Sequence, residues 1–331
     1  MAASSLRRQL TIVGGLLLLL AVVSLLSLLS GAKTIAPADI WYSLRGQLDN
    51  ADSVIVMQSR LPRTLAGILA GLALGGAGAV IQALTRNPLA DPGILGVNAG
   101  ASFAIALGIS LFGVTGVLGW LGFAWSGALI ASIAVWLIGS LGGGRVNPVR
   151  LTLAGVALSA VLSGMTSSLA LLNPQTFDQM RIWQAGTLDI RSLSNMTFVA
   201  PAIIGGCLLA LLSARALNTL SMGEEMAAAL GTHVLLVRLM AVLAVMMMCG
   251  SATALVGPIG FVGLMVPHVA RWWVGSDQRW VLGASLLMAP ILLLVADIVG
   301  RLLVPGELRV SIVTAFIGAP VLIWLVRQRK H

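Results

Sequence analysis

Apolar runs about as long as a lipid bilayer is thick follow one another along this chain. A helix that crosses the hydrocarbon core needs about 20 mostly apolar residues, and about ten such runs fit within the 331 residues. Backbone polar groups inside a bilayer must find partners within the chain, so these runs predict an all-α integral membrane protein. The predicted spans are residues 10–30, 62–84, 93–113, 118–139, 151–172, 196–216, 234–255, 258–275, 280–303 and 310–327. Residues 1–331 are therefore expected to form a single transmembrane domain.

The composition excludes other classes of protein. Hydrophobic residues make up 58% of the chain and charged residues 9%, whereas a soluble domain has roughly 25% charged residues. The net charge of +9 comes from basic residues spread along the chain, so no face is predicted to bind nucleic acid. The two cysteines, Cys207 and Cys249, lie inside apolar runs and are too few for a zinc site.

The first apolar run has an alternative interpretation as a signal peptide. Arg7 and Arg8 precede it, and residues 30–32 (Ser-Gly-Ala) resemble a cleavage site. The run from Leu10 to Leu29 is longer than the usual apolar region of about 7–15 residues. We therefore favour a spanning helix.

Basic residues between the spans predict the orientation. With ten spans both termini lie on one side, where we place 12 of the 20 Lys and Arg residues. Basic residues are in excess on the cytoplasmic side of membrane proteins. The bias is modest and predicts that both termini are cytoplasmic.

Hydroxyl side chains recur at helical spacing on the fifth and tenth predicted spans. Such stripes either hold helices together or line a wet pathway, and spacing alone leaves both open. The residues are Thr152, Ser159, Ser163 and Ser167 on the fifth span and Ser311 and Thr314 on the tenth.

The segment between the sixth and seventh spans predicts a short capped helix at about residues 221–231. Ser221 and Glu224 have the spacing of a capping box, and Gly231 is placed to end the helix. A helix this short is marginal alone in water. Its apolar stripe therefore either packs on the protein's own membrane domain or binds a partner. The stripe consists of Met222, Met226 and Leu230.

Signatures of catalysis are missing from the sequence. There is no HExxH or GxSxG motif, and Ala32-Lys33-Thr34 lacks the glycine that precedes the P-loop lysine. We expect no enzyme activity and no cofactor, so ATP-driven work would need a separate subunit. Inside the spans, Asp297 and Arg301 have the spacing of an ion pair. The absence of further buried acids argues against an ion-coupled secondary transporter.

Several longer motifs resemble the permease subunits of the iron–siderophore and vitamin B12 family of ABC importers. Two further stretches are similar to those of the family members that carry ferric enterobactin, a catecholate siderophore. The family motifs are residues 60–64, 85–98, 257–271 and 318–324, and the two stretches are 96–103 and 304–310. The resemblance runs from about residue 10 to 330.

The resemblance implies a type II ABC importer permease fold in the bacterial inner membrane. Helices two to five and seven to ten form a repeat in the family, and an offset of five spans makes it inverted. The permease works with a second permease subunit, either a copy or a paralogue. Two ATP-binding subunits lie on the cytoplasmic side and a periplasmic substrate-binding protein lies on the other.

The resemblance also assigns roles to residues. Arg60, Arg63 and Arg301 would offer guanidinium groups to carboxylates of the binding protein, and we expect Arg60 and Arg63 to project from the outer membrane edge. The helix at 221–231 would couple to the ATPase, and the two hydroxyl stripes would line the pathway. Asn147 and Pro148 would lie near the inner gate.

We therefore predict the permease of a ferric siderophore importer. The alternatives are a permease of the same build for heme, cobalamin or another metal chelate, or a stand-alone secondary transporter. The missing acid chain and the capped helix speak against the last of these.

Overall fold

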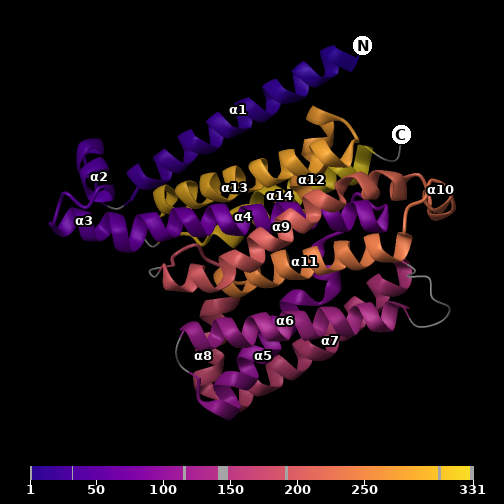
Figure 1. The fold of residues 1–331 in the computed structure, drawn as a ribbon. Helices are drawn as coiled ribbons and strands as arrows, with labels where there is room; N and C mark the ends of the chain where they lie inside the picture. Colours follow the sequence, from indigo (N-terminus) through magenta and orange to yellow (C-terminus); the bar gives the residue numbers. More distant parts are fainter. Residues whose placement is uncertain are drawn as a thin grey trace.

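The computed structural model describes residues 2–31, 33–114, 117–140, 148–190, 193–304 and 307–328, and every element in these ranges is a helix. Each of the ten predicted spans corresponds to one helix (Figure 1). These are α1 (Ala2–Leu29), α4 (Leu61–Thr85), α5 (Val97–Phe112), α6 (Val117–Ser140), α7 (Pro148–Leu172), α9 (Ser194–Ser221), α11 (Val234–Val256), α12 (Val262–Val274), α13 (Gln278–Leu303) and α14 (Val310–Gln328).

Seven helices among the described residues are long and apolar enough to cross a membrane. The shorter ones include α5 and α12, whose predicted spans at 93–113 and 258–275 began too early. A 3-10 helix, η2 (Pro92–Leu95), precedes α5, and Gly257 and Phe261 before α12 have positive φ angles of 76° and 69°. Proline and left-handed residues interrupt the helix at these points. Non-helical backbone is tolerated at membrane depth where protein covers it.

Short helices lie at the two ends of the bundle (Figure 1). One end carries α2 (Pro37–Leu44), α3 (Ala51–Ile55) with the π-helix η1 (Val56–Arg60), and α8 (Pro174–Gln184). The opposite end carries α10 (Glu224–Ala229), the start of α1 and the end of α14. We call them the α2 end and the α10 end. The chain therefore begins and ends on the same side, as the even number of spans predicts.

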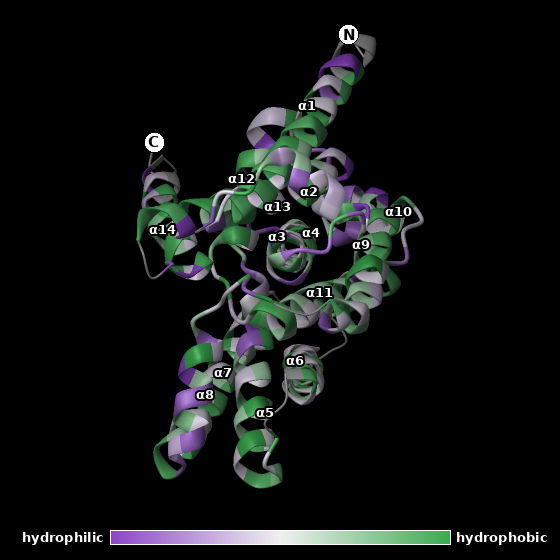
Figure 2. Ribbon diagram, turned by 90° about the vertical axis from the view of Figure 1, so that its left-hand side faces the viewer, coloured by the Kyte–Doolittle hydropathy of each residue, from purple (hydrophilic) through white to green (hydrophobic). Residues whose placement is uncertain are grey.

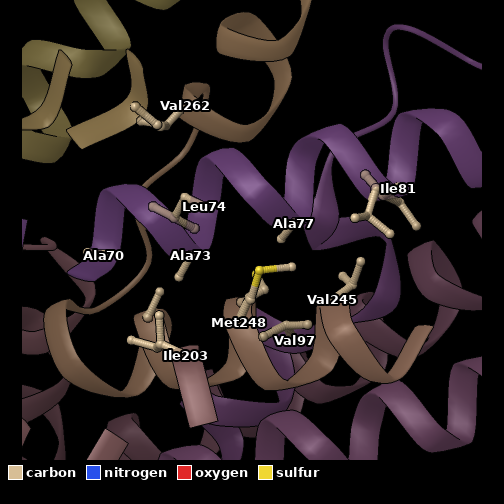
Figure 3. Close-up of a cluster of buried hydrophobic side chains, with 14 of the residues drawn as sticks. Ala70, Ala73, Leu74, Ala77, Ile81, Val97, Ile203, Val245, Met248 and Val262 are labelled. Carbon is tan, nitrogen blue, oxygen red and sulfur yellow. The ribbon is translucent and has the colours of Figure 1, made fainter. Parts of the chain in front are cut away.

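Helix α4 runs through the centre of the molecule and packs against α9, α11, α12 and α13 (Figure 2). Its small residues allow close approach, since a Cβ on Gly71 would overlap the backbone of Pro290 in α13 and one on Gly78 would overlap Gly263 in α12. Around these contacts lies a buried apolar cluster in which Met248 of α11 reaches the α4 alanines (Figure 3). The core is thus a tight contact of helices around α4.

The contacts between helices have the pattern expected of the inverted repeat. Helix α4 packs on α13 as α11 packs on α6, and α5 contacts α6 and α7 as α12 contacts α13 and α14. Helix α4 starts at the α2 end, whereas α11 starts at the α10 end (Figure 1). Exchanging the four helices α4–α7 with α11–α14 therefore reproduces the packing with reversed direction.

Helix α7 is the least covered of the long spans. Only 11% of its most apolar window is buried within the chain, and Leu153, Val156 and Leu171 are exposed on it. This face therefore needs lipid or another protein to cover it.

Candidate functional site

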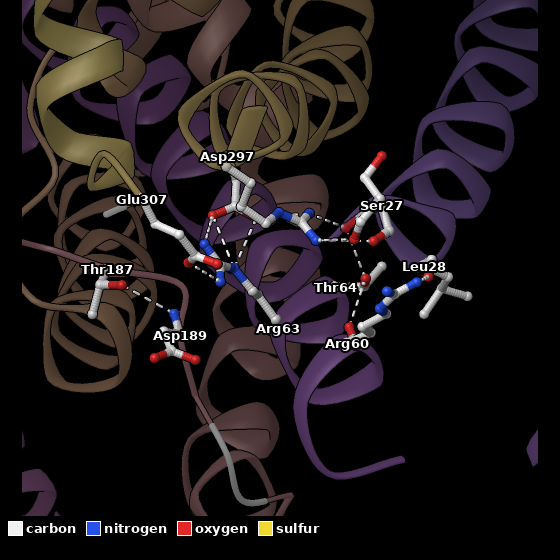
Figure 4. Close-up of polar contacts among 11 residues, drawn as sticks. Ser27, Leu28, Arg60, Arg63, Thr64, Thr187, Asp189, Asp297 and Glu307 are labelled. Carbon is white, nitrogen blue, oxygen red and sulfur yellow. Dashed lines mark hydrogen bonds and ion pairs between the residues drawn. The ribbon is translucent and has the colours of Figure 1, made fainter. Parts of the chain in front are cut away.

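A buried cluster of ionic side chains lies between α4 and α13 at the α2 end (Figure 4). Arg63 donates from Nε and Nη2 to the Asp297 carboxylate at 2.8–3.1 Å. The Arg301 guanidinium lies 2.9 Å from the same carboxylate, which confirms the pair predicted one turn apart. The Asp297 side chain is only 1% exposed. One carboxylate thus holds two buried guanidinium groups.

Arg60 and Arg301 bind the C-terminal end of α1. Arg60 Nη1 donates to the carbonyls of Leu28 and Leu29 at 2.8 Å. Arg301 Nη1 donates to the carbonyls of Ser27 and Ser30 at 3.1 and 2.8 Å. The last carbonyls of a helix have no partners within it. The two arginines therefore cap α1 and attach it to the bundle.

The expectation that Arg60 and Arg63 project from the membrane edge is wrong. Both side chains are buried, because the ends of α1 and α13 close over them. The network reaches solvent through Glu307, which accepts from Arg63 Nη1 at 2.8 Å and has a side chain 44% exposed. Sequence reasoning missed Asp297 and Glu307 as partners of Arg63, because they lie more than 230 positions away in the chain.

A polar pocket of about 440 Å³ lies beside α7. Three of the four hydroxyl residues predicted on this helix line it, namely Ser159, Ser163 and Ser167. The remaining lining residues, which sequence reasoning did not assign to a pathway, are Gly93, Asn98, Ala99, Ser102, Thr166, Gln184 and Pro258. Most of them come from other elements, so the periodicity of one helix could not reveal them.

The α14 stripe and Thr152 do not line this pocket. Ser311 donates to the carbonyl of Ala185, and Thr314, which is buried, donates to the carbonyl of Ser311 at 3.0 Å. Both α14 hydroxyls therefore donate to backbone carbonyls, and their assignment to the pathway stays a prediction.

The predicted inner gate falls at the start of α7. Pro148 is the first residue of that helix. Asn147 lies outside the described residues.

The predicted capping box on α10 is wrong. Helix α9 continues through Ser221, whose hydroxyl donates to the carbonyl of Asn218 at 2.6 Å. Gly223 is the N-cap residue and makes no side-chain cap. Glu224 instead forms an ion pair with Arg238 and lies 3.9 Å from Arg86. Serine commonly bonds back along its own helix in this way, which removes it from the following one.

The predicted stop at Gly231 is confirmed. Gly231 has a φ of 80° and donates to the carbonyl of Ala228 at 2.9 Å, while Thr232 donates to the carbonyl of Ala227 at 2.9 Å. These are the two bonds of a Schellman motif, which needs a left-handed residue at this position.

The side chains of the predicted apolar stripe are exposed, although Met222 lies at the end of α9 and not on α10. Met226 is 51% exposed, and Met222 and Leu230 are also exposed. The alternative that these side chains pack on the protein's own membrane domain is therefore wrong. The structure leaves three large apolar side chains exposed in the segment from the end of α9 to the end of α10.

Residues 18–328 match the FecCD transport family. The chain belongs to this family. Among its relatives, the ferric enterobactin transport system permease protein FepD of Escherichia coli is 59% identical over 320 residues, covering 96% of each chain. The vitamin B12 import system permease protein BtuC of Citrobacter koseri is 40% identical over 323 residues, covering 95% of this chain and 93% of BtuC. The hemin transport system permease protein HmuU of Yersinia pestis is 36% identical over 325 residues, covering 96% of each.

A solved structure shows that this FecCD family member has the fold of an ABC transporter permease. An inward-facing conformation of a metal-chelate type ABC transporter matches with a TM-score of 0.82 and 28% identity, covering 96% of this chain and 99% of the other. The predicted family and the all-α permease fold are confirmed. Every candidate residue from Arg60 to Thr314 falls within the matched region.

Proposed function

We propose that this chain is the permease subunit of an ATP-driven importer that carries a ferric catecholate siderophore such as ferric enterobactin. The 59% identity to FepD over 96% of both chains carries this proposal. The vitamin B12 and hemin permeases are clearly less similar, at 40% and 36%.

The importer contains a second permease, two ATP-binding subunits and a periplasmic binding protein. Both termini and α10 face the cytoplasm. In support, all three lie at one end of the bundle (Figure 1), and Arg86, Arg215 and Arg279 add basic charge there. The exposed stripe of α10 docks on an ATP-binding subunit, because three large apolar side chains at a cytoplasmic surface require a partner.

The pathway runs along the α7 face, with Ser159, Ser163 and Ser167 toward the cargo. In support, these hydroxyls line a pocket on the helix least covered by its own chain. A second permease subunit seated against this face would close the pathway. Pro148, the first residue of α7, and Asn147, which precedes it in the sequence, then belong to its inner gate.

The binding protein docks at the α2 end. Arg63 keeps Nε and Nη2 on Asp297 and turns Nη1 toward Glu307. A carboxylate of the binding protein can replace the half-exposed Glu307 on this group without opening the buried cluster. Arg60 and Arg301 then act indirectly, because they attach the end of α1 to the bundle beside this docking surface.

The test is uptake into proteoliposomes that contain the whole complex. We expect ATP-dependent uptake of radiolabelled ferric enterobactin that exceeds uptake of a ferric hydroxamate, heme or cobalamin. A preference for heme or cobalamin would reject the cargo, and uptake that needs no ATP would reject the importer class.

A matched pair of variants tests the pathway. Ser163→Leu places a bulky side chain in the pocket and should slow uptake about tenfold while complex assembly stays intact. Ser168→Leu makes the same change on an exposed position of α7 outside that pocket and should have little effect. Equal slowing by both variants, or loss of assembly with Ser163→Leu, would reject the pathway assignment.

A further inference from the structure

A second pocket, of about 430 Å³, opens at the α10 end and carries positive charge. Arg86 and Arg271 line it, and no carboxylate of the described residues does. The remaining lining residues are Gln82, Ala83, Pro88, Ser221, His268, Trp272 and Gln278. In a chain with only 9% charged residues, two guanidinium groups in one pocket form a concentrated anion-binding surface.

Arg271 is held in place by a buried glutamine. Its Nη1 donates to Gln82 Oε1 at 2.7 Å. Gln82 Nε2 in turn donates to the carbonyl of Leu264 at 2.9 Å, and the Gln82 side chain is buried. The glutamine is thereby fixed with its oxygen toward the arginine. Such fixed orientation suits a guanidinium that must meet a carboxylate in one geometry.

Arg86 is placed differently, at the point where α4 ends. It adopts a left-handed conformation with a φ of 52°, and its side chain is 45% exposed. Its ion-pair partner is Glu224 of α10, but the separation of 3.9 Å is too long for a hydrogen bond. Glu224 makes its close contact with Arg238 instead. The Arg86 guanidinium can therefore take a closer carboxylate.

The other acidic group near this pocket is already engaged. Asp277, which precedes the lining residue Gln278, lies 2.7 Å from Arg279 Nη2 and accepts from Asn218 Nδ2 at 2.7 Å. It is turned toward these partners and is not part of the pocket wall. Among the described residues, therefore, the pocket is lined by two arginines and by no acidic side chain.

The position of the pocket indicates a protein partner. Its lining comes from the ends of α4, α9, α12 and α13 and not from a lateral face of the bundle. Ser221, on its rim, ends α9 immediately before the α10 segment. The pocket is thus continuous with the surface that carries the exposed α10 stripe.

We propose that this pocket receives an acidic side chain of the ATP-binding subunit and binds it through Arg86 and Arg271. The contact is a second anchor beside α10, and it rests on the proposed function. The α10 stripe supplies apolar area, whereas the arginine pocket fixes the orientation of the partner and steers its approach.

The test measures binding of the purified ATP-binding subunit to the full-length chain in nanodiscs. The double variant Arg86→Gln/Arg271→Gln should weaken binding at least tenfold and flatten its dependence on salt, because paired charges are screened. Arg279→Gln removes an arginine at the same end but outside the pocket, and its affinity should stay within twofold of wild type. Arg271→Lys keeps the charge without the bidentate geometry, so its affinity should lie between those of the double variant and Arg279→Gln.

Three results would overturn the proposal. The first is unchanged affinity and salt dependence in the double variant. The second is an equal loss of affinity in Arg279→Gln. The third is pocket-dependent retention of phosphatidylglycerol in mixed nanodiscs with unchanged subunit binding, which would assign the pocket to lipid.

A purely structural role is tested by the thermal midpoint of each variant. If a variant binds the ATP-binding subunit more weakly only because its thermal midpoint is lower, cooling should restore its affinity. That result would also overturn the proposal. Preference for a different cargo in the uptake assay would reject the proposed substrate while leaving this contact intact.

Discussion

The two ends of helix α4 differ in how their arginines are paired, with Arg63 at the start of the helix and Arg86 at its end. At the α2 end, Arg63 and Arg301 are buried against one carboxylate, and Arg60 is buried against backbone carbonyls. At the α10 end, Arg86 is half-exposed and 3.9 Å from its nearest acid. Buried ion pairs are costly to break because each partner left alone is a charge without water. The α2 end is therefore preassembled, whereas the α10 end keeps charge available to a partner.

The largest expected effect comes from breaking the preassembled end. Asp297→Asn removes the charge that holds Arg63 and Arg301, and it should lower the free energy of unfolding by about 3–5 kcal/mol. The measurement is the thermal or denaturant midpoint of the chain in nanodiscs. Asp277→Asn is the matched control, because it removes a carboxylate paired with a half-exposed arginine at the other end. A shift for Asp297→Asn no larger than that of the control would contradict the comparison.

The next effect concerns the attachment of α1. Arg60→Met keeps much of the apolar stem but removes donors to the carbonyls of Leu28 and Leu29. Hydrogen bonds from charged groups are each worth about 1.5–3 kcal/mol, so the end of α1 should loosen. Hydrogen exchange of the amides at 26–31 should speed up while those of α13 stay protected. Arg45→Met, on an exposed arginine at the same end, should leave both unchanged.

The contrast also shows what sequence can reveal. A helix at each of the ten predicted spans, the Asp297–Arg301 pair and the stop at Gly231 follow from local spacing, and the structure has all three. The burial of Arg60 and Arg63 could not be predicted in this way, because it depends on α1 and α13, distant in the chain. Proline at the start of a helix suggests an exposed end, and here tertiary packing overrides that local signal.

The capping box failed for a related reason. Ser221 and Glu224 have the right spacing, but α9 extends through Ser221 and uses its hydroxyl. Glu224 instead forms an ion pair with Arg238, which lies 14 positions further along the chain. A motif of four residues does not indicate where the preceding helix ends, and boundaries are the least reliable part of a sequence-based prediction. The sequence predicts only part of the α7 pocket. Its three serines share one helix and follow from periodicity, whereas Asn98 and Gln184 come from other elements.

A smaller effect is expected at Glu307, through which the buried cluster of Arg63, Asp297 and Arg301 reaches solvent. Glu307→Gln frees Arg63 Nη1 for a carboxylate of the binding protein, so docking should become about 2–5-fold tighter at low salt, as expected for an exposed ion pair. Asp178→Asn is the control, because this carboxylate is exposed at the same end and lies 3.7 Å from Arg181. Surface plasmon resonance with the purified binding protein measures both. Weaker docking of Glu307→Gln would show that Glu307 itself contributes to the docking surface.

The smallest expected effect is the pH dependence of the α10 end. Hydrogen bonds from the Arg279 guanidinium and the Asn218 amide hold the pKa of Asp277 at about 2, below its ordinary 3.8. A depressed carboxyl pKa stabilises the folded state above the unfolded value, and that contribution is lost as the pH falls toward the folded value. The advantage of wild type over Asp277→Asn should therefore be constant above about pH 5 and shrink between about pH 4 and pH 2. Asparagine can still cap α13, so the difference between the two midpoints isolates the charge. A difference that grows on acidification would contradict this assignment, and one that stays flat down to pH 2 would place the titration elsewhere.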